Sequence, residues 1–226
     1  MLWNSLVDLQ HVFIEKFANL GEEIDEPGMA HFNRPGWLNR VWQTESARRC
    51  HIDVVDARDT KKIWMMHVCV FPSLTNTSPI FGFDVISGKN KITGAFHDFS
   101  ATTDQNHFML HWFADSVKAF VPSKKRDLPE WARNIFSPSM VAAGNVKTAA
   151  ESQEIIDLTI RNLDYYFEHI GESDGKGDRV SVLERQNYYC ENQKQNPHTA
   201  RVMKSLGMNA EDVDRFCSDI LFPTEI

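Results

Sequence analysis

Large apolar side chains recur every three or four positions through the first twenty residues of the chain. They stand at Trp3, Leu6, Leu9, Phe13, Phe17 and Leu20. This spacing places them along one side of a helix, and we predict an amphipathic helix over residues 4–20. Glycines and prolines are frequent in residues 21–37. Both residue types interrupt regular structure, so this segment is predicted to be a loop.

Five apolar segments with the character of strands follow the loop. Their expected ranges are 38–44, 48–56, 62–71, 80–87 and 91–99. Short turns such as "SGKN" join the later segments, and connections this short favour antiparallel neighbours. We therefore predict an antiparallel sheet in the first half of the chain.

The remainder of the chain has the pattern of helices. Residues 103–120 are predicted to be helical, and "KKRDLPEW" breaks the chain near Pro129. A helical stripe stands at Ile156, Ile160, Leu163 and Phe167. Further helices are expected at 180–194, 198–206 and 210–221. Helices before and after a run of strands predict an α+β fold with helices packed over the sheet. No long linker divides the chain, so residues 1–226 are expected to form a single domain.

Composition narrows the class of protein. The chain has 226 residues, of which 42% are hydrophobic and 11% aromatic, enough for a sizeable core. Mean hydropathy is −0.38, no apolar run approaches the length of about 18 residues that a membrane span needs, and no signal peptide is visible. The four cysteines lack a C-x-x-C pair, which favours reduced thiols and a cytoplasmic protein. A net charge of −7 argues against general nucleic-acid binding.

Ionisable residues interrupt the strands where a core-facing segment is normally apolar. The stretch "IWMMHVCVFPSLTNTSPIFGFD" carries His67 in one strand and Asp84 in the next. Residues two apart share a face of a strand, so "HID" places His51 and Asp53 together. If the three strands are neighbours, one register brings all four groups to one side. Gly82, on the face of Asp84, leaves room for a large molecule to approach the sheet.

The ionisable residues have several interpretations. A single histidine in a strand is more often a hydrogen-bonded core residue, and Asp53 also suits a frayed strand end. The carboxylate within "FGFDV" is harder to explain structurally, because burial is costly unless it is paired or protonated. A metal site built from the four residues is conceivable, although no H-E-x-x-H or similarly compact spacing supports it. No serine or cysteine stands out as an activated nucleophile, which disfavours a hydrolase, and no glycine-rich phosphate loop is present, which disfavours a nucleotide site.

Four segments together resemble a known family, the ferredoxin-dependent bilin reductases. These are "HVCVFP", "PIFGFD", "ITGAFHDFS" and "YYCENQKQNPHTARVM" with a later "LF". The resemblance runs from about Asn39 to Phe222 and is greatest to the phycocyanobilin:ferredoxin oxidoreductase branch, with its phage-type phycoerythrobilin-forming relatives. It implies a monomeric, three-layer α/β/α sandwich that holds biliverdin IXα between the antiparallel sheet and the C-terminal helices. It also implies no bound metal or flavin, with reduced plant-type [2Fe-2S] ferredoxin as the external electron donor.

The resemblance implies a reason for the ionisable groups on the sheet. Ferredoxin delivers electrons singly and brings no protons, so each two-electron reduction, which passes through bilin radicals, takes protons from the pocket. A neutral, desolvated carboxylic acid or a His–Asp pair that shares a proton is a suitable donor. Asp84 matches the central catalytic aspartate of the family, His67 matches its histidine partner, and His51 matches another pocket histidine.

Two departures from the family pattern bear on the product. Asp53 stands where phycocyanobilin-forming enzymes have the glutamate that serves reduction of the D-ring vinyl group, and aspartate is one methylene shorter. We therefore predict four-electron reduction to phycoerythrobilin through 15,16-dihydrobiliverdin, with phycocyanobilin as the alternative. Asn196 stands where some phycoerythrobilin-forming relatives have a second catalytic aspartate. Since an amide donates no acidic proton, protonation of the A-ring would use His67, Asp84 or ordered water.

Both the substrate, which carries two propionates, and the acidic electron donor are expected to bind to positively charged residues. Arg126 matches a propionate-binding arginine, and His198 stands where relatives have a lysine. Lys194 and Arg201 are further candidates, although simple surface charge explains both, and Thr93 matches a small hydroxyl that contacts the pocket. Ferredoxin is acidic, so docking requires a local positive face. The candidates for that face are Lys61, Lys62, Lys89, Lys91, Lys124 and Lys125.

Three functions stay open at this point. The chain is a bilin reductase, a bilin-binding carrier that has kept the fold without the chemistry, or a structural α+β domain. The pair of His67 and Asp84 favours the reductase, because binding an apolar tetrapyrrole does not require a proton donor.

Overall fold

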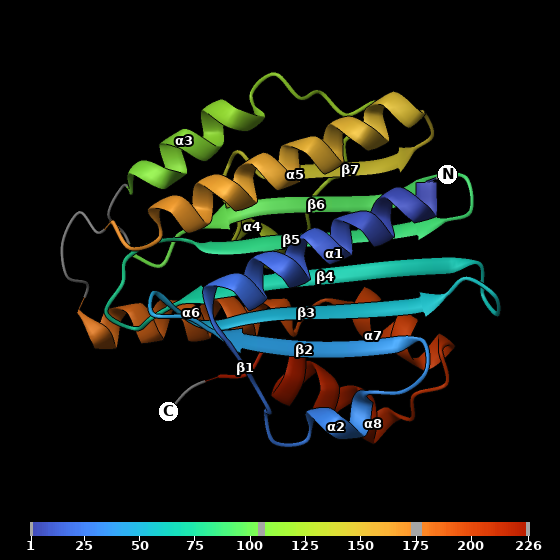
Figure 1. Cartoon of the computed structure of the whole chain (residues 1–226), viewed down its shortest axis with the longest axis horizontal. Coiled ribbons are helices and arrows are strands. Elements are labelled where there is room, and N and C mark those ends of the chain that lie inside the picture. The colour runs from blue at the N-terminus through green and yellow to red at the C-terminus, as the bar shows by residue number, and fades with distance from the viewer. Residues whose placement is uncertain (1, 104–106, 173–177, 225–226) are drawn as a thin grey trace.

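A seven-stranded sheet forms the centre of the computed structural model, which describes residues 2–103, 107–172 and 178–224. Every strand pairs antiparallel with the next strand in sequence (Figure 1). The strands are β1 (Glu22–Ile24), β2 (Trp37–Gln43), β3 (Ala47–Ala57), β4 (Ile63–Pro72), β5 (Ile80–Gly88), β6 (Ile92–Ser100) and β7 (Val141–Val146). The predicted α+β class with an antiparallel sheet is confirmed.

Three helices cover one face of the sheet (Figure 1). They are α1 (Leu2–Leu20), α3 (Phe108–Val117) and α5 (Ala149–His169). The apolar side of α1 is buried, and the ring of Phe13 stacks on Phe83 of β5 at a centroid distance of 5.9 Å. On the same face His97 bonds the carbonyl oxygen of Gly82 and the side chain of Asn162 on α5, at 2.7 and 3.0 Å. This layer holds the larger hydrophobic core and fixes the sheet from behind.

Helices of between 4 and 15 residues cover the opposite face. They are α2 (Met29–Phe32), α4 (Glu130–Arg133), α6 (Arg179–Gln193), α7 (Pro197–Ser205), α8 (Ala210–Arg215) and the π-helical turn η1 (Phe216–Leu221). Side-chain caps set where the C-terminal helices begin, because an Asn or Asp before the first turn accepts from a free backbone N–H. Asp178, Asn196 and Asn209 make such bonds to the starts of α6, α7 and α8.

Most boundaries agree with the sequence prediction, and there are four differences. The helix over 4–20 and the five strands are confirmed to within a residue or two. The predicted loop over 21–37 contains β1 and α2, and the second half contains β7 as well as helices. Helix α3 is shorter than the predicted 103–120, of which residues 104–106 lie outside the described residues. The helix predicted at 210–221 changes to a π-helix at Phe216.

Strands β1 and β7 were not predicted because their sequences have little of the apolar pattern of a strand. Strand β1 is three residues long with two exposed glutamates, and β7 has the sequence "VAAGNV" of mostly small side chains. Both exist because they pair with a long neighbour, β2 or β6. Among the helices of the described residues, none is both long enough and apolar enough to cross a bilayer. The four cysteines are unpaired.

Candidate active site

The register of three central strands brings the predicted ionisable residues into a row. Asp53 of β3 is the direct partner of His67 on β4, and His67 is the direct partner of Asp84 on β5. His51 lies two residues before Asp53 and is the partner of Cys69. The shared face predicted from alternation along the strands is therefore confirmed, and it is the face that carries the C-terminal helices.

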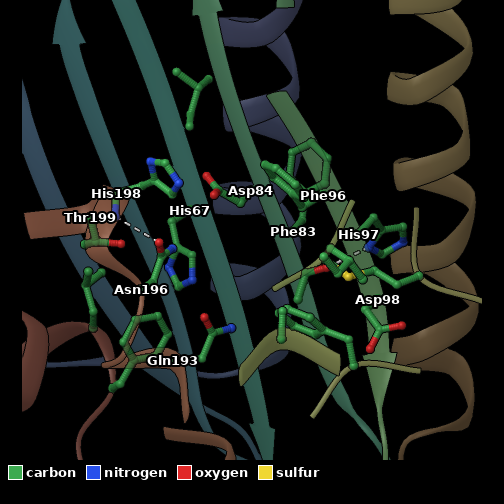
Figure 2. Close-up of a pocket in the computed structure, with 18 of the residues that line it drawn as sticks. His67, Phe83, Asp84, Phe96, His97, Asp98, Gln193, Asn196, His198 and Thr199 are labelled. Atoms are coloured by element: carbon green, nitrogen blue, oxygen red, sulfur yellow. Dashed lines mark hydrogen bonds between the residues drawn. The ribbon is translucent and has the colours of Figure 1, made fainter. Parts of the chain in front are cut away.

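A cavity of about 350 Å³ lies between this face and the helices. Figure 2 shows His67 and Asp84 next to each other, with Asn196 and His198 approaching from the start of α7. Most of the remaining wall is apolar or aromatic, with contributions from Met65, Ile86, Phe96, Trp131, Phe136, Met140, Met203, Leu221 and Phe222. A largely apolar cavity with a few convergent polar groups is typical of a site for an organic ligand.

Asp84 is an acid that keeps a substantial protonated fraction near neutral pH. Burial raises the pKa of its carboxyl group to about 7, although the positive charge of Arg126 acts in the opposite direction. The residue is nevertheless partly accessible from the cavity. A carboxylic acid of this kind can give a proton to a bound molecule at the pH of a cell.

Asp53 is a second acid in the same cavity, held by a tryptophan. The indole Nε1 of Trp37 donates to Asp53 Oδ1 at 2.7 Å. Burial raises the pKa of Asp53 to about 7, the Trp37 hydrogen bond lowers it, and the charge of Asp84 raises it further. The bond fixes one carboxyl oxygen, which leaves Oδ2 as the oxygen free to hold the proton.

His67 is a neutral imidazole between the two acids. Burial lowers its pKa to about 4, and the positive charge of Arg49 acts in the same direction. The ring of Phe222 meets the imidazole edge-on at a centroid distance of 5.4 Å. Near neutral pH the acidic protons of this row therefore reside on the carboxyl groups, and His67 is suited to accept or relay a proton.

His51 lies behind the cavity wall rather than in it. It is fully buried, and its Nε2 is 3.1 Å from Asn39 Oδ1. Burial holds its pKa well below the usual value, with Arg49 and His67 contributing. His51 is not among the cavity-lining residues, so any action on a ligand would pass through His67, whose ring centroid is 6.3 Å away.

Arg126 lies at the cavity wall on the far side of Asp84. Its NH2 donates to the carbonyl oxygen of Thr93 at 2.9 Å, and its side chain crosses Gly144 of β7. A Cβ at position 144 would come within 2.9 Å of the arginine, so glycine is needed for this approach. Thr93 itself is absent from the wall, because its hydroxyl donates to the carbonyl oxygen of Ile86.

The other predicted binding residues divide into two groups. Asn196 and His198 line the cavity, and the Asn196 side chain accepts from the backbone N–H of His198 at 3.0 Å as the cap of α7. Lys194 and Arg201 do not line it. Lys194 is bonded to Glu191 at 2.8 Å, and Arg201 is exposed on α7.

Four of the six lysines predicted for docking lie in two hairpin turns at one end of the sheet, and Lys124 and Lys125 lie in a segment that pairs with β7. All are exposed. Lys61 and Lys62 come just before Ile63. Ile63 pairs with Gly88, which comes just before Lys89 and Lys91. The carbonyl oxygen of Lys124 accepts from the backbone N–H of Gly144, and Lys91 Nζ donates to Asn145 Oδ1, the next residue of β7, at 2.8 Å. Strand β7 thus places Lys124 and Lys125 near the other four lysines.

Asp98 and Tyr189 line the cavity and were missed by the sequence analysis. Asp98 Oδ2 accepts from Ser100 Oγ at 2.6 Å and from the backbone N–H of Ser137 at 2.9 Å, and burial raises its pKa to about 6. The sequence "FHDFS" shows an aspartate within an apolar strand, but only the β5–β6 register places Asp98 opposite Gly82.

The space beside Gly82 is also narrower than the sequence implied. The Tyr189 hydroxyl lies 3.4 Å from where a Cβ at position 82 would stand. Part of the space beside Gly82 that was expected to hold a ligand is therefore filled by Tyr189 of α6. Within the described residues, no group of three or more His, Cys, Asp and Glu side chains is arranged to hold a metal ion, so the four residues of the metal hypothesis are not so arranged.

The chain is similar to known proteins over almost its whole length. The sequence model for ferredoxin-dependent bilin reductase matches residues 5–223. Phycocyanobilin:ferredoxin oxidoreductase from Synechococcus sp. is 28% identical over 189 residues, which cover 81% of this chain and 74% of that protein. The solved structure of PcyX has 36% identity and a TM-score of 0.72, covering 98% of this chain and 99% of its own.

A more distant structure shares the fold. Phytochromobilin synthase from tomato, solved in complex with biliverdin, is 15% identical, with a TM-score of 0.74 over 95% of this chain and 82% of its own.

Proposed function

The chain belongs to the ferredoxin-dependent bilin reductase family, and from this we propose that it reduces biliverdin IXα in the cavity above His67 and Asp84. One observation carries the proposal: the row of Asp53, His67 and Asp84 lies across neighbouring strands at the cavity, and both acids have raised pKa values. A carrier would need the apolar wall but not the acids.

Each residue has a role in this proposal. Electrons arrive one at a time from ferredoxin, and each double bond that is reduced takes up two electrons and two protons. Asp84 donates the first proton to the bilin, because a substantial fraction of its acid is protonated near pH 7 and it is accessible from the cavity. His67, neutral between the two carboxyl groups, relays protons between them. Arg126 and His198 bind the propionates, and the apolar wall holds the tetrapyrrole against the sheet.

We propose phycoerythrobilin, formed through 15,16-dihydrobiliverdin, as the product of a four-electron reduction. The support is Asp53, whose short side chain is tied to Trp37 at 2.7 Å and so reaches less far into the cavity than glutamate. The similarity to PcyX over nearly all of both chains agrees with phycoerythrobilin as the product. Phycocyanobilin is the alternative product.

An anaerobic assay with biliverdin and chemically or enzymatically reduced ferredoxin tests the function. We expect consumption of biliverdin and formation of blue-shifted bilins, identified by chromatography against standards. A stable bound spectrum without turnover would instead indicate a carrier, and no spectral change at all would leave only a structural domain.

Lengthening the Asp53 side chain is expected to change the product distribution. In Asp53→Glu the carboxyl group extends one methylene further, so we expect more reduction at the D-ring and a higher fraction of phycocyanobilin among the products. Asp53→Asn is the matched control, because it removes the acid without adding length. Identical product ratios in wild type and Asp53→Glu would mean that the orientation of the bilin, and not this residue, selects the site of reduction.

We propose that ferredoxin docks at the lysine end of the sheet, defined by Lys61, Lys62, Lys89, Lys91, Lys124 and Lys125. Both hairpin turns in this set belong to strands that carry the acid row. An acidic carrier seated there would lie close to the cavity, since Met65 and Ile86, near the turns, line it. Local charge of this kind steers association even when the net charge of the protein is negative.

A higher salt concentration is expected to weaken ferredoxin docking much more than bilin binding. Raising NaCl from low to high concentration should lower kcat/KM for ferredoxin by about tenfold or more and change the biliverdin Kd by less than about threefold. Lys89→Glu/Lys91→Glu should reproduce the loss at low salt. Arg179→Glu is the control, because α6 begins at the opposite end of the molecule (Figure 1). Equal salt sensitivity of both constants would contradict this docking face.

A further inference from the structure

Arg49 carries a buried charge on the cavity side of the sheet. Its side chain is 3% exposed. Nε and NH2 donate to the two carboxylate oxygens of Glu26, both at 2.6 Å, in the bidentate geometry that gives arginine its strongest ion pairs. Glu26 lies between β1 and α2, so this pair ties the segment before α2 to strand β3.

The same guanidinium also binds the C-terminal end of the chain. NH2 donates to the carbonyl oxygen of Ile220 at 2.7 Å, inside the π-helical turn η1. Two residues later, Phe222 meets the ring of His67 and lines the cavity. A π-helical turn leaves its carbonyl groups in a less regular pattern than an α-helix, and Arg49 bonds one of them. One side chain thus connects three segments that are distant in sequence.

The charge of Arg49 acts on the imidazoles of the site. Arg49 is two residues before His51 on β3, and its charge lowers the pKa of His51 and of His67, in each case after burial as the larger cause. The ionisable groups that face His67 are Asp53 on β3, Asp84 on β5, His51, Cys69 on its own strand and His198 from α7. Arg49 is a fixed cation near this set, because guanidinium does not deprotonate in proteins.

We propose that Arg49 is a positioning residue of this site, which holds η1 and Phe222 over His67 and keeps a permanent positive charge beside the two histidines. Together with burial, its charge keeps the exchangeable acidic protons on the carboxyl groups, where the proposed reduction uses them. Only this last consequence rests on the proposed function, because placement and charge are properties of the protein without ligand.

Three variants separate charge from anchoring in the ligand-free protein. Arg49→Lys keeps the charge and loses the bidentate pair, Arg49→Met loses both, and Glu26→Gln/Arg49→Met removes the two charges together without leaving a lone carboxylate. The histidine titrations are followed by NMR of ring-labelled protein, and the exchange of the amides of residues 216–222 by mass spectrometry.

We expect the titration midpoint of His67 to rise by about half a pH unit or more in Arg49→Met, because the imidazolium then has one positive neighbour fewer, and to rise less in the double variant, which also loses the negative charge of Glu26. In Arg49→Lys the midpoint should stay at the wild-type value. Amide exchange over 216–222 should be about tenfold faster in the Met variants and intermediate in Arg49→Lys, while exchange in α5 stays unchanged.

Two results would overturn the proposal. An unchanged His67 midpoint in Arg49→Met would remove the charge role, and unchanged exchange over 216–222 would remove the anchoring role. Neither measurement involves bilin or ferredoxin, so a protein that fails to reduce biliverdin would leave both results interpretable. If it does reduce biliverdin, Arg49→Met should lower kcat and move the acidic limb of the pH profile, and Arg49→Lys should restore the pH profile fully and kcat in part.

Discussion

Asp84→Asn is expected to lower the rate of bilin reduction by about 100-fold or more while the biliverdin Kd stays within about threefold of wild type. The amide has the size and much of the hydrogen-bonding capacity of the acid, so the cavity keeps its shape. What it loses is the acidic proton that burial retains near pH 7. Single-turnover spectra with reduced ferredoxin measure the rate, and titration of the bilin absorption measures the affinity.

Asp127→Asn is the matched control for this experiment. Asp127 also lines the cavity, but it is exposed and lies on the segment that follows Arg126. The same change of acid to amide there should leave the rate within about threefold of wild type. Near-normal turnover of Asp84→Asn would remove Asp84 from the proton transfer, whereas an equal loss in both variants would indicate a general effect of cavity charge.

The same substitution is expected to stabilise the folded protein at high pH. Because the folded pKa of Asp84 lies above its ordinary value of 3.8, the folded state binds this proton more tightly than the unfolded state. Stability is therefore lost as pH rises from about 4 to about 7, and the full cost is present above the folded pKa. Asp84→Asn removes a group that has to ionise in a buried site, and we expect its free energy of unfolding at pH 8 to exceed that of wild type by on the order of 2 kcal/mol.

Urea denaturation of the ligand-free protein at pH 5 and pH 8 measures this effect. The advantage of Asp84→Asn should be smaller at pH 5, where the wild-type acid is still protonated. Asp98→Asn provides the contrast: its carboxylate accepts from Ser100 and Ser137, so the amide should destabilise the protein at both pH values. An Asp84→Asn protein no more stable than wild type at pH 8 would contradict the raised pKa.

The acid row could be predicted from the sequence because it depends on alternation and strand order alone. His67 and Asp84 fall on one face once their strands are antiparallel neighbours, and the short turns favour that arrangement. Asp98 follows the same rule, but its placement needed the β5–β6 register, which shifts between Ile86 and Ser87. An irregularity of this kind has no reliable signal in a single sequence.

Residues that act through distant partners were beyond reach of the sequence. Arg49 in "RRCHID" looks like a surface cation at a strand start, and only the folded chain shows it buried against Glu26 and Ile220. Thr93 was assigned to the pocket, yet its hydroxyl is taken by the carbonyl oxygen of Ile86. The contacts of Arg49 depend on tertiary packing, whereas the Thr93 bond lies within the β5–β6 hairpin, next to its register irregularity.

The order of the strands has a consequence for the synthesis of the protein. Since each strand pairs with the one made just before it, the sheet can assemble progressively as the chain leaves the ribosome, without waiting for distant partners. The walls supplied by α6, α7 and Phe222 come last. A nascent chain therefore presents Asp53 and Asp84 on an uncovered sheet. The cavity closes only when the C-terminal helices have packed over that face.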